Sequence, residues 1–226
     1  MLVLSIGHHD QVCRNAEQDA DMPGRIGRVT DEMQALWDRE AVTFDDAPDH
    51  GLRDPAVRRA WTDLLLPLLG GHGRRVADLG CGTGTLSALL ATEGRHLVHG
   101  VDLSPEMVRR ARAKSVQVLP QPIFTVADAA DPPLPTAMFD AVLSRHVLWA
   151  MPDPSAALRR WIELLAPGGV LILVEGRWST GAGLTAAECS RLVGDLRDVV
   201  DLRPLDDPAY WGRLIDDERY LIVSAR

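Results

Sequence analysis

The chain has 226 residues, 46% of them hydrophobic and 25% charged, which is enough for one sizeable globular α/β domain and a modest appendage. The formal net charge is −8 and the arginines are scattered among acidic residues, so a nucleic-acid partner is disfavoured. No apolar run approaches the roughly 20 residues that span a bilayer, so we expect a cytoplasmic protein with no membrane partner. Three cysteines, Cys13, Cys81 and Cys189, are too scattered for a disulfide framework or a zinc site, so we expect no metal.

The first 30 residues are predicted to form a polar, flexible tail. They show no apolar periodicity, carry several acidic residues and contain a Pro23-Gly24 pair that we interpret as a break. No fold is predicted for residues 1–30.

A helical lid is predicted over residues 31–70. From Met33 onward the apolar residues recur at helical spacing, and a loop then leads to a second amphipathic helix. Asp54 followed by Pro55 is typical of the cap and first turn of that second helix. We expect both helices to cover a core formed by residues 71–226.

Residues 76–84 carry the most specific pattern of the core. An apolar run breaks into glycines at positions 80, 82 and 84 and then opens a helix. Such glycines allow a turn at positive φ and a close approach of a ligand to the main chain, while the helix offers free N–H groups. Asp102 ends a second apolar run, where a carboxylate can accept both hydroxyls of a ribose. The pattern predicts a Rossmann-like cofactor site.

Strands and helices alternate through the rest of the core. The pattern predicts a doubly wound α/β fold with a seven-stranded, mostly parallel sheet whose last strand is antiparallel, and with helices on both faces. The expected strands lie near residues 75–79, 97–102, 122–127, 140–145, 170–174, 199–204 and 219–225.

Polar residues follow the apolar runs at the carboxyl ends of five of these strands. Ligands of doubly wound sheets bind outside those ends, where the strand order reverses. We therefore expect one shared site near Asp78, Asp102, Asp128, His146 and Glu175.

The glycine pattern resembles motif I of the class I S-adenosylmethionine-dependent methyltransferases. Asp78 stands two positions before the Gly80-x-Gly82-x-Gly84 run, as the motif requires. The resemblance covers roughly residues 35–226 and is strongest to the small-molecule branch related to ubiquinone and menaquinone biosynthesis enzymes. It implies transfer of a methyl group from S-adenosylmethionine to an oxygen, nitrogen or carbon of a small organic acceptor in specialised metabolism, with S-adenosylhomocysteine as product.

Two other functions stay open from the sequence. A nucleotide-dependent oxidoreductase uses a similar sheet, but the dinucleotide fingerprint places its third glycine one position later, where this chain has Thr85. A cofactor-binding regulatory module without turnover fits the same motif. Both a monomer and a homodimer are compatible with the sequence.

The resemblance also implies roles for individual residues. The glycine loop contacts the methionine portion of the cofactor, Asp102 takes the ribose hydroxyls, and Asp128 reads the adenine edge. The cofactor-binding set implied in this way is Asp78, Gly80, Cys81, Gly82, Gly84, Asp102, Leu103, Met107, Asp128, Ala129 and Ser144.

The acceptor side is predicted from the segment after the fourth strand. Ser144-Arg145-His146 stands where methyltransferases that act on amide or adenine nitrogens carry an Asn-Pro-Pro-Tyr type of motif, which argues against DNA adenine or protein glutamine as acceptors. His146 can take a proton near neutral pH and is our predicted general base; hydrogen bonding to the cofactor and simple packing are the alternatives. The predicted substrate pocket comprises Trp37, Phe44, His50, Arg145, Trp149 and Arg177.

Overall fold

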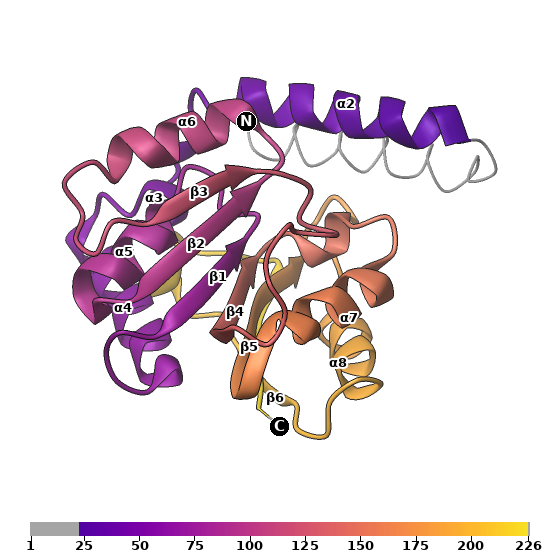
Figure 1. Cartoon of the computed structure of the whole chain (residues 1–226). Helices are drawn as coiled ribbons and strands as arrows, with labels where there is room; N and C mark the ends of the chain where they lie inside the picture. The colour runs from indigo at the N-terminus through magenta and orange to yellow at the C-terminus, as the bar shows by residue number, and fades with distance from the viewer. Residues whose placement is uncertain (1–22, 226) are drawn as a thin grey trace.

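The structure, a computed structural model, describes the backbone of residues 23–225 and the side chains of residues 31–225. Its centre is a seven-stranded sheet in the order β3-β2-β1-β4-β5-β7-β6 (Figure 1). The strands are β1 (Arg75–Leu79), β2 (Leu97–Asp102), β3 (Ile123–Val126), β4 (Phe139–Arg145), β5 (Leu165–Arg177), β6 (Asp201–Pro204) and β7 (Glu218–Ser224).

Strand directions confirm the predicted architecture. The strands from β3 to β5 run parallel, whereas β7 is antiparallel to both of its neighbours, β5 and β6. The strand order reverses between β1 and β4. At this switch point the carboxyl ends of two adjacent parallel strands diverge into loops on opposite sides, which is where a doubly wound sheet binds its ligand.

Helices cover both faces of the sheet. The helical elements are α2 (Pro23–Glu40), η1 (Phe44–Asp46), α3 (Pro48–Gly51), α4 (Pro55–Leu69), α5 (Thr85–Gly94), α6 (Pro105–Lys114), η2 (Leu148–Ala150), α7 (Pro154–Leu164), α8 (Ala186–Gly194) and η3 (Pro208–Tyr210). Side chains of α4 and α5 pack in one apolar core with one face of β1, β4 and β5, and those of α7 and α8 pack against the other face. Because successive strand residues face opposite sides, both cores draw on the same central strands.

Helix starts follow the local sequence. Asp54 Oδ1 accepts a hydrogen bond from the Ala56 amide at 2.7 Å, which confirms the predicted cap of α4. Ser104 Oγ likewise accepts from the Met107 amide at 3.0 Å at the start of α6. These side-chain acceptors satisfy amides that have no partner within the helix. The capping residues therefore fix the residue at which each helix begins.

The lid begins earlier than its apolar pattern indicates. Residues 1–22 of the predicted tail lie outside the described residues, but residues 23–30 are helical and belong to α2. The Pro23-Gly24 pair is therefore part of a helix instead of a break, because proline is compatible with the first helical turn, where its missing N–H costs no hydrogen bond. The C-terminal end of α2 lies beside the start of α6 (Figure 1), where Asp38 Oδ1 accepts from the Ser104 hydroxyl at 2.5 Å and the Glu106 amide at 3.0 Å.

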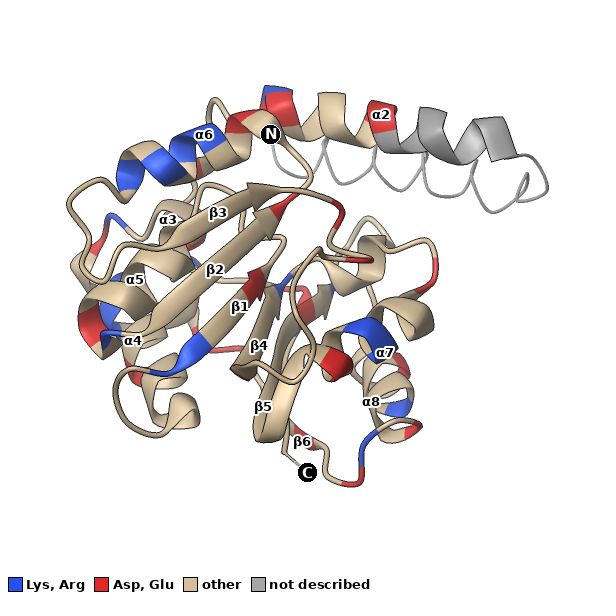
Figure 2. Ribbon diagram, viewed as in Figure 1, with Lys and Arg blue, Asp and Glu red and all other residues tan. Residues whose placement is uncertain are grey.

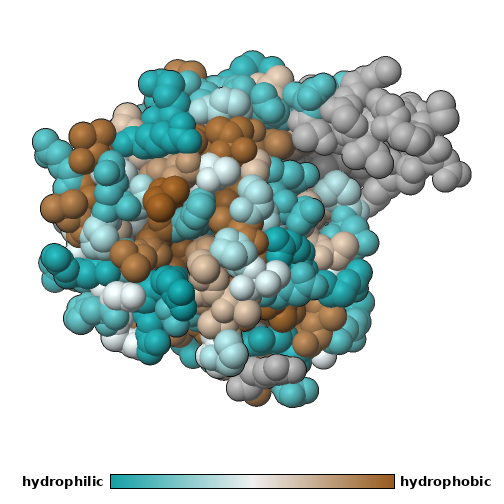
Figure 3. Space-filling view, viewed as in Figure 1, coloured by the Kyte–Doolittle hydropathy of each residue, from teal (hydrophilic) through white to brown (hydrophobic). Residues whose placement is uncertain are grey.

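Charged and apolar residues are unevenly distributed over the fold. Acidic residues mark the carboxyl ends of β1 and β2, and basic residues gather along α6 (Figure 2). Apolar side chains are visible among polar ones on the face that carries β3 (Figure 3), where Ile123 and Val126 are exposed. Within residues 23–225, none of the helices combines the length and the apolar character needed to cross a membrane.

Candidate functional site

The turn between β1 and α5 has the conformation that its glycines allow. Gly80, Gly82 and Gly84 have φ values of +71°, +54° and +72°. A Cβ on Gly80 would lie 2.2 Å from Val147 Cγ2, and one on Gly84 would lie 2.7 Å from Ala111 Cβ. Glycine is therefore required at these positions for two reasons: the backbone is left-handed, and neighbouring side chains approach too closely for a Cβ.

Asp102 holds this turn in place from the end of β2. Its Oδ2 accepts a hydrogen bond from the Gly82 amide at 2.8 Å, and its Oδ1 accepts from the Ser104 amide at 2.9 Å. Burial raises the pKa of the Asp102 carboxyl to about 6, against the effect of the two amides. The carboxylate thus orders the loop that would meet a cofactor; its predicted contact with ribose hydroxyls stays a prediction.

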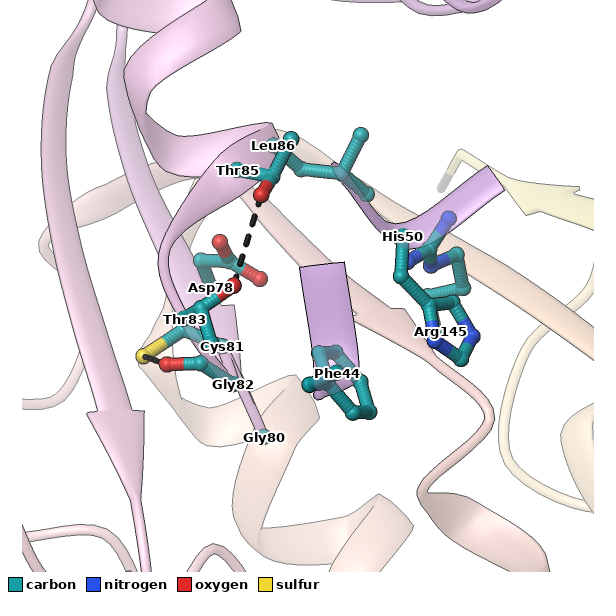
Figure 4. A pocket seen from close by; sticks show the side chains of 10 residues that line it. All are labelled: Phe44, His50, Asp78, Gly80, Cys81, Gly82, Thr83, Thr85, Leu86 and Arg145. Carbon is teal, nitrogen blue, oxygen red and sulfur yellow. Dashed lines mark hydrogen bonds between the residues drawn. The ribbon is translucent and has the colours of Figure 1, made fainter. Parts of the chain in front are cut away.

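A small cleft opens beside the glycine turn (Figure 4). Its lining joins predicted cofactor residues with predicted pocket residues: Phe44, His50, Asp78, Gly80, Cys81, Gly82, Thr83, Thr85, Leu86 and Arg145. The Phe44 ring stacks on His50 with centroids 4.2 Å apart, and a Cβ on Gly82 would lie 3.3 Å from Phe44 Cε1. The lid therefore forms one wall of the cleft and the glycine turn the opposite wall.

Two hydrogen-bonded side chains fasten the lid to the turn. Asp45 accepts a hydrogen bond from the Thr83 hydroxyl at 2.5 Å and pairs with Lys114 Nζ at 2.9 Å. Lys114 also donates to the hydroxyls of Thr83, at 3.0 Å, and Thr85. We did not predict this contact from the sequence; the available signal was that Lys114 is the one lysine of the chain.

His146 lies in an aromatic cluster beside the cleft. Its φ is +60°, and its ring centroid lies 5.2 Å from that of Trp178 and 5.9 Å from that of Trp211. Its Nδ1 is buried and finds no hydrogen-bond partner among the described residues. Burial, together with nearby cationic groups, holds the pKa of His146 well below its usual value, so the ring is neutral near pH 7.

Further rings and a cation complete that cluster. Trp149 Nε1 donates to the His146 carbonyl at 3.0 Å, and its ring lies 5.1 Å from that of Trp178. The buried Arg219 guanidinium lies over Trp178 at 4.9 Å and over Trp211 at 5.6 Å, which is within the range of cation–π attraction. Trp211 and Arg219 were absent from the prediction because they come from the last segment of the chain, remote from every motif.

Glu175, at a predicted strand end, anchors the loop that carries His146. Its Oε1 accepts from the amides of Val147, at 3.0 Å, and Leu148, at 2.8 Å. The side chain is fully buried, and burial raises its pKa to about 8. Glu175 is therefore protonated near neutral pH, and it holds the His146 loop by accepting hydrogen bonds from two of its backbone amides.

Other predicted residues differ in how far they are exposed. Cys81, Leu103 and Trp37 are partly exposed, whereas Met107, Ala129 and Ser144 are buried, and Ser144 Oγ has no hydrogen-bond partner in the described part of the chain. No group of three or more His, Cys, Asp and Glu side chains among the described residues is arranged to hold a metal ion.

Two predicted residues are exposed and lie outside the lining of the cleft. Asp128 is exposed, and its Oδ1 accepts from the Ala130 amide at 2.8 Å. Arg177 is exposed too, and its Nη1 donates to the Gly183 carbonyl at 2.8 Å. The structure therefore does not bring Arg177 together with the other predicted pocket residues.

Comparisons with known proteins agree with the fold and the motif. Residues 77–173 match a family model described as a methyltransferase domain. The chain is 35% identical over 175 residues to 27-O-demethylrifamycin SV methyltransferase of Amycolatopsis mediterranei (strain S699), covering 76% of this chain and 60% of that protein. It is 41% identical over 141 residues to ubiquinone biosynthesis O-methyltransferase of Xanthomonas campestris pv. campestris (strain B100), covering 61% and 54%. The chain thus spans little more than half the length of these relatives.

A solved structure shows the same arrangement of the sheet and its helices. Magnesium protoporphyrin IX methyltransferase from Synechocystis PCC 6803, crystallised with bound S-adenosylmethionine, superposes with a TM-score of 0.60 at 26% identity, covering 75% of this chain and 80% of that chain.

Proposed function

We propose that this chain, whose residues 77–173 belong to the methyltransferase domain family, transfers a methyl group from S-adenosylmethionine to a small organic acceptor. The observation that carries the proposal is the left-handed glycine turn after β1, fixed by Asp102 from the end of β2 and facing a cleft. Backbone amides at such a turn and a carboxylate at such a strand end suit an adenosine cofactor.

An oxygen acceptor is favoured over nitrogen or carbon. Of the two relatives, one is named an O-methyltransferase of ubiquinone biosynthesis and the other a methyltransferase of a 27-O-demethylrifamycin. The second name also supports a role in specialised metabolism. The cytoplasmic location remains part of the proposal and rests on the unpaired cysteines of the sequence.

The chain's residues have distinct tasks in this reaction. The sulfonium of the cofactor supplies an electrophilic methyl group, so catalysis depends mainly on positioning the acceptor in line and excluding water. Asp102 and the glycine turn hold the cofactor, with Leu103 and Met107 near the adenine and Asp128 and the Ala129 amide at its edge. The lid closes the opposite wall through Phe44.

His146 serves as general base when the acceptor is a hydroxyl. Its Nδ1, which has no hydrogen-bond partner in the described chain, supports this assignment, because a general base needs a ring nitrogen that other groups do not occupy. The partly exposed Trp149 ring, which packs against the buried Trp178, provides an apolar surface on which a planar acceptor packs.

Calorimetric titration with S-adenosylhomocysteine, beside NADH, tests the cofactor. We expect micromolar binding of S-adenosylhomocysteine and none of NADH; the reverse result favours the oxidoreductase. Turnover is then measured as S-adenosylhomocysteine formed from S-adenosylmethionine with a panel of phenols and hydroxylated polyketides. Binding without product across the panel supports a regulatory module instead.

A further inference from the structure

His146 has a backbone conformation that residues other than glycine rarely adopt. Its φ is +60°, in the left-handed region that favours glycine. Leu52 and Arg95 have a similar φ, but each of them caps the end of a helix, where this conformation is common. His146 instead follows strand β4. A strained residue of this kind persists only where its surroundings hold it, and such residues cluster at functional sites.

Hydrogen bonds fix the backbone of His146 on both sides. Its amide donates to the Val174 carbonyl at 2.8 Å, and its carbonyl accepts from Trp149 Nε1 at 3.0 Å. Since Arg145 pairs in register with Val174, the left-handed turn lies where β4 ends beside β5. Contacts with the neighbouring strand and with Trp149 therefore support a conformation that the His146 side chain disfavours.

Glu175 holds the two residues that follow His146. Its Oε1 accepts from the amides of Val147, at 3.0 Å, and Leu148, at 2.8 Å. Its other oxygen, Oε2, is buried and has no hydrogen-bond partner among the described residues. Within the described chain, every hydrogen bond of the Glu175 carboxyl is therefore made to the loop that carries His146.

The left-handed turn also fixes His146 relative to the glycine turn. A Cβ on Gly80 would lie 2.2 Å from Val147 Cγ2, so Val147 packs directly on the glycine turn. The ring of His146, one residue earlier, lies 5.2 Å from that of Trp178. In-line methyl transfer is sensitive to such geometry, because a misplacement of about 1 Å can cost about a hundredfold in rate.

We propose that Glu175 is a positioning residue for methyl transfer, which holds the left-handed turn through the amides of Val147 and Leu148 and so aims the His146 ring at the acceptor hydroxyl. This assignment rests on the proposed function, in which His146 is the general base. The competing explanation is that Glu175 only stabilises the fold.

Three variants separate these explanations. Glu175→Gln keeps an oxygen that can accept from both amides, and its NH₂ group replaces Oε2, which no donor of the described chain approaches. Glu175→Met has a similar length but no acceptor for either amide. Glu188→Met is the matched control, because Glu188 Oε2 also accepts from a backbone amide, that of Thr185 at 2.8 Å, but at the start of α8.

Nitrogen NMR spectra of the histidine rings test the position of His146 without an acceptor. The His146 signal is the one that disappears in His146→Asn. We expect this signal to shift or broaden in Glu175→Met, because the ring then leaves its place beside Trp178. The same signal should stay unchanged in Glu175→Gln and in the Glu188→Met control.

A double-mutant cycle with His146→Asn tests whether Glu175 acts through His146. Turnover is measured as S-adenosylhomocysteine formed with a phenol or polyketide acceptor of the panel, and cofactor affinity by calorimetry. Alone, Glu175→Met should lower kcat about tenfold or more and change S-adenosylhomocysteine affinity less than about threefold. Added to His146→Asn, it should lower kcat less than about twofold further, since groups that act as a unit are not additive.

The conservative variant and the control complete the kinetic pattern. Glu175→Gln should restore kcat to within about threefold of the wild type, whereas Glu188→Met should change kcat less than about twofold even where it lowers stability. Circular dichroism establishes that each variant is folded. If Glu175→Met does not fold, Glu175→Asp replaces it, because a side chain shorter by one methylene group withdraws the acceptor from both amides.

Two results would overturn the assignment. An unchanged His146 signal in the folded Glu175→Met or Glu175→Asp variant would show that Glu175 does not position the ring. Losses of kcat that multiply in the double variant would show that Glu175 acts on the fold and not through His146. If the wild-type chain neither bound S-adenosylhomocysteine nor turned over any acceptor, the proposed function itself would fail, and the assignment with it, whereas either of the first two results leaves that function intact.

Discussion

The two sides of the candidate site are built in different ways. The proposed cofactor side consists mostly of backbone: the left-handed glycine turn and the Asp102 carboxylate that binds the Gly82 amide, all from one β-α-β unit. The proposed acceptor side lies beside the cleft and consists of rings and a cation from distant segments, with His146 beside Trp178 and Trp211. A backbone site leaves a local sequence motif, whereas a side-chain cluster of this kind leaves none.

The largest effect should come from the point where the two sides touch. Gly80→Ala places a Cβ 2.2 Å from Val147 Cγ2 at a φ of +71°. We expect S-adenosylhomocysteine binding to fall more than a hundredfold and unfolding free energy to fall by about 1–3 kcal/mol from overpacking. Gly168→Ala is the control, because Gly168 has a φ of +78° but no atom within 4 Å of its Cβ position. Equal effects of the two variants would show that backbone strain alone is responsible.

A substitution on the acceptor side should separate chemistry from binding. His146→Asn removes the base while asparagine still tolerates the positive φ. We expect kcat to drop about a hundredfold, within the usual range for a general base, and cofactor affinity to stay within threefold. Steady-state kinetics and calorimetry measure the two quantities. Loss of cofactor affinity would make His146 a cofactor ligand.

A substitution on the cofactor side should do the opposite. Asp102→Asn keeps one acceptor oxygen but sets its NH₂ against one of the amides that Asp102 now binds. We expect the S-adenosylhomocysteine affinity to weaken more than tenfold, or roughly 1.5–3 kcal/mol for a charged hydrogen-bond site. Asp201→Asn, at an exposed ion pair on β6, should leave the calorimetric affinity unchanged. Unaltered affinity in Asp102→Asn would remove Asp102 from the site.

Glu175, which holds the His146 loop, should make the free energy of unfolding depend on pH. Burial raises the pKa of Glu175 from 4.5 to about 8, so the folded chain keeps a proton that the unfolded chain has lost. Stability contributed by this group is complete below pH 4.5 and falls until about pH 8. The pKa values of Asp78 and Asp102 are raised to about 6, so their similar losses end near pH 6.

Glu175→Gln isolates this contribution. Between pH 6 and 8 we expect wild-type unfolding free energy, from urea titrations, to fall by about 1–3 kcal/mol relative to that of the variant, because glutamine cannot ionise. Parallel pH profiles of the two proteins would show that Glu175 is already charged in the folded state.

The smallest effect on activity is expected from a substitution at Arg177, which lies outside both sides of the candidate site. Arg177 is exposed and its guanidinium is bound to the Gly183 carbonyl, so Arg177→Ala should change kcat/KM less than twofold. A tenfold loss would mean that this loop rearranges to meet the acceptor.

Local sequence determined the sheet, the turn and the helix starts. The glycines at 80, 82 and 84, Asp102 at a strand end, and the Asp54 cap are each set by residues that are close in the chain, through φ preferences, strand alternation and capping hydrogen bonds. Residue propensities and the periodicity of apolar residues depend on such short-range effects, so these features can be predicted from the sequence.

Tertiary structure alone decided which side chains meet across the cleft. The pairing of Lys114 with Asp45, the position of Arg219 over Trp178, and the shared cleft of Asp78 and Arg145 join segments far apart in the chain. Each depends on strand order, register and helix packing, since a side chain's partners are fixed only once the whole sheet has brought its segments together. The sequence by itself determined the backbone of the site, and only the folded chain determined the chemistry of its walls.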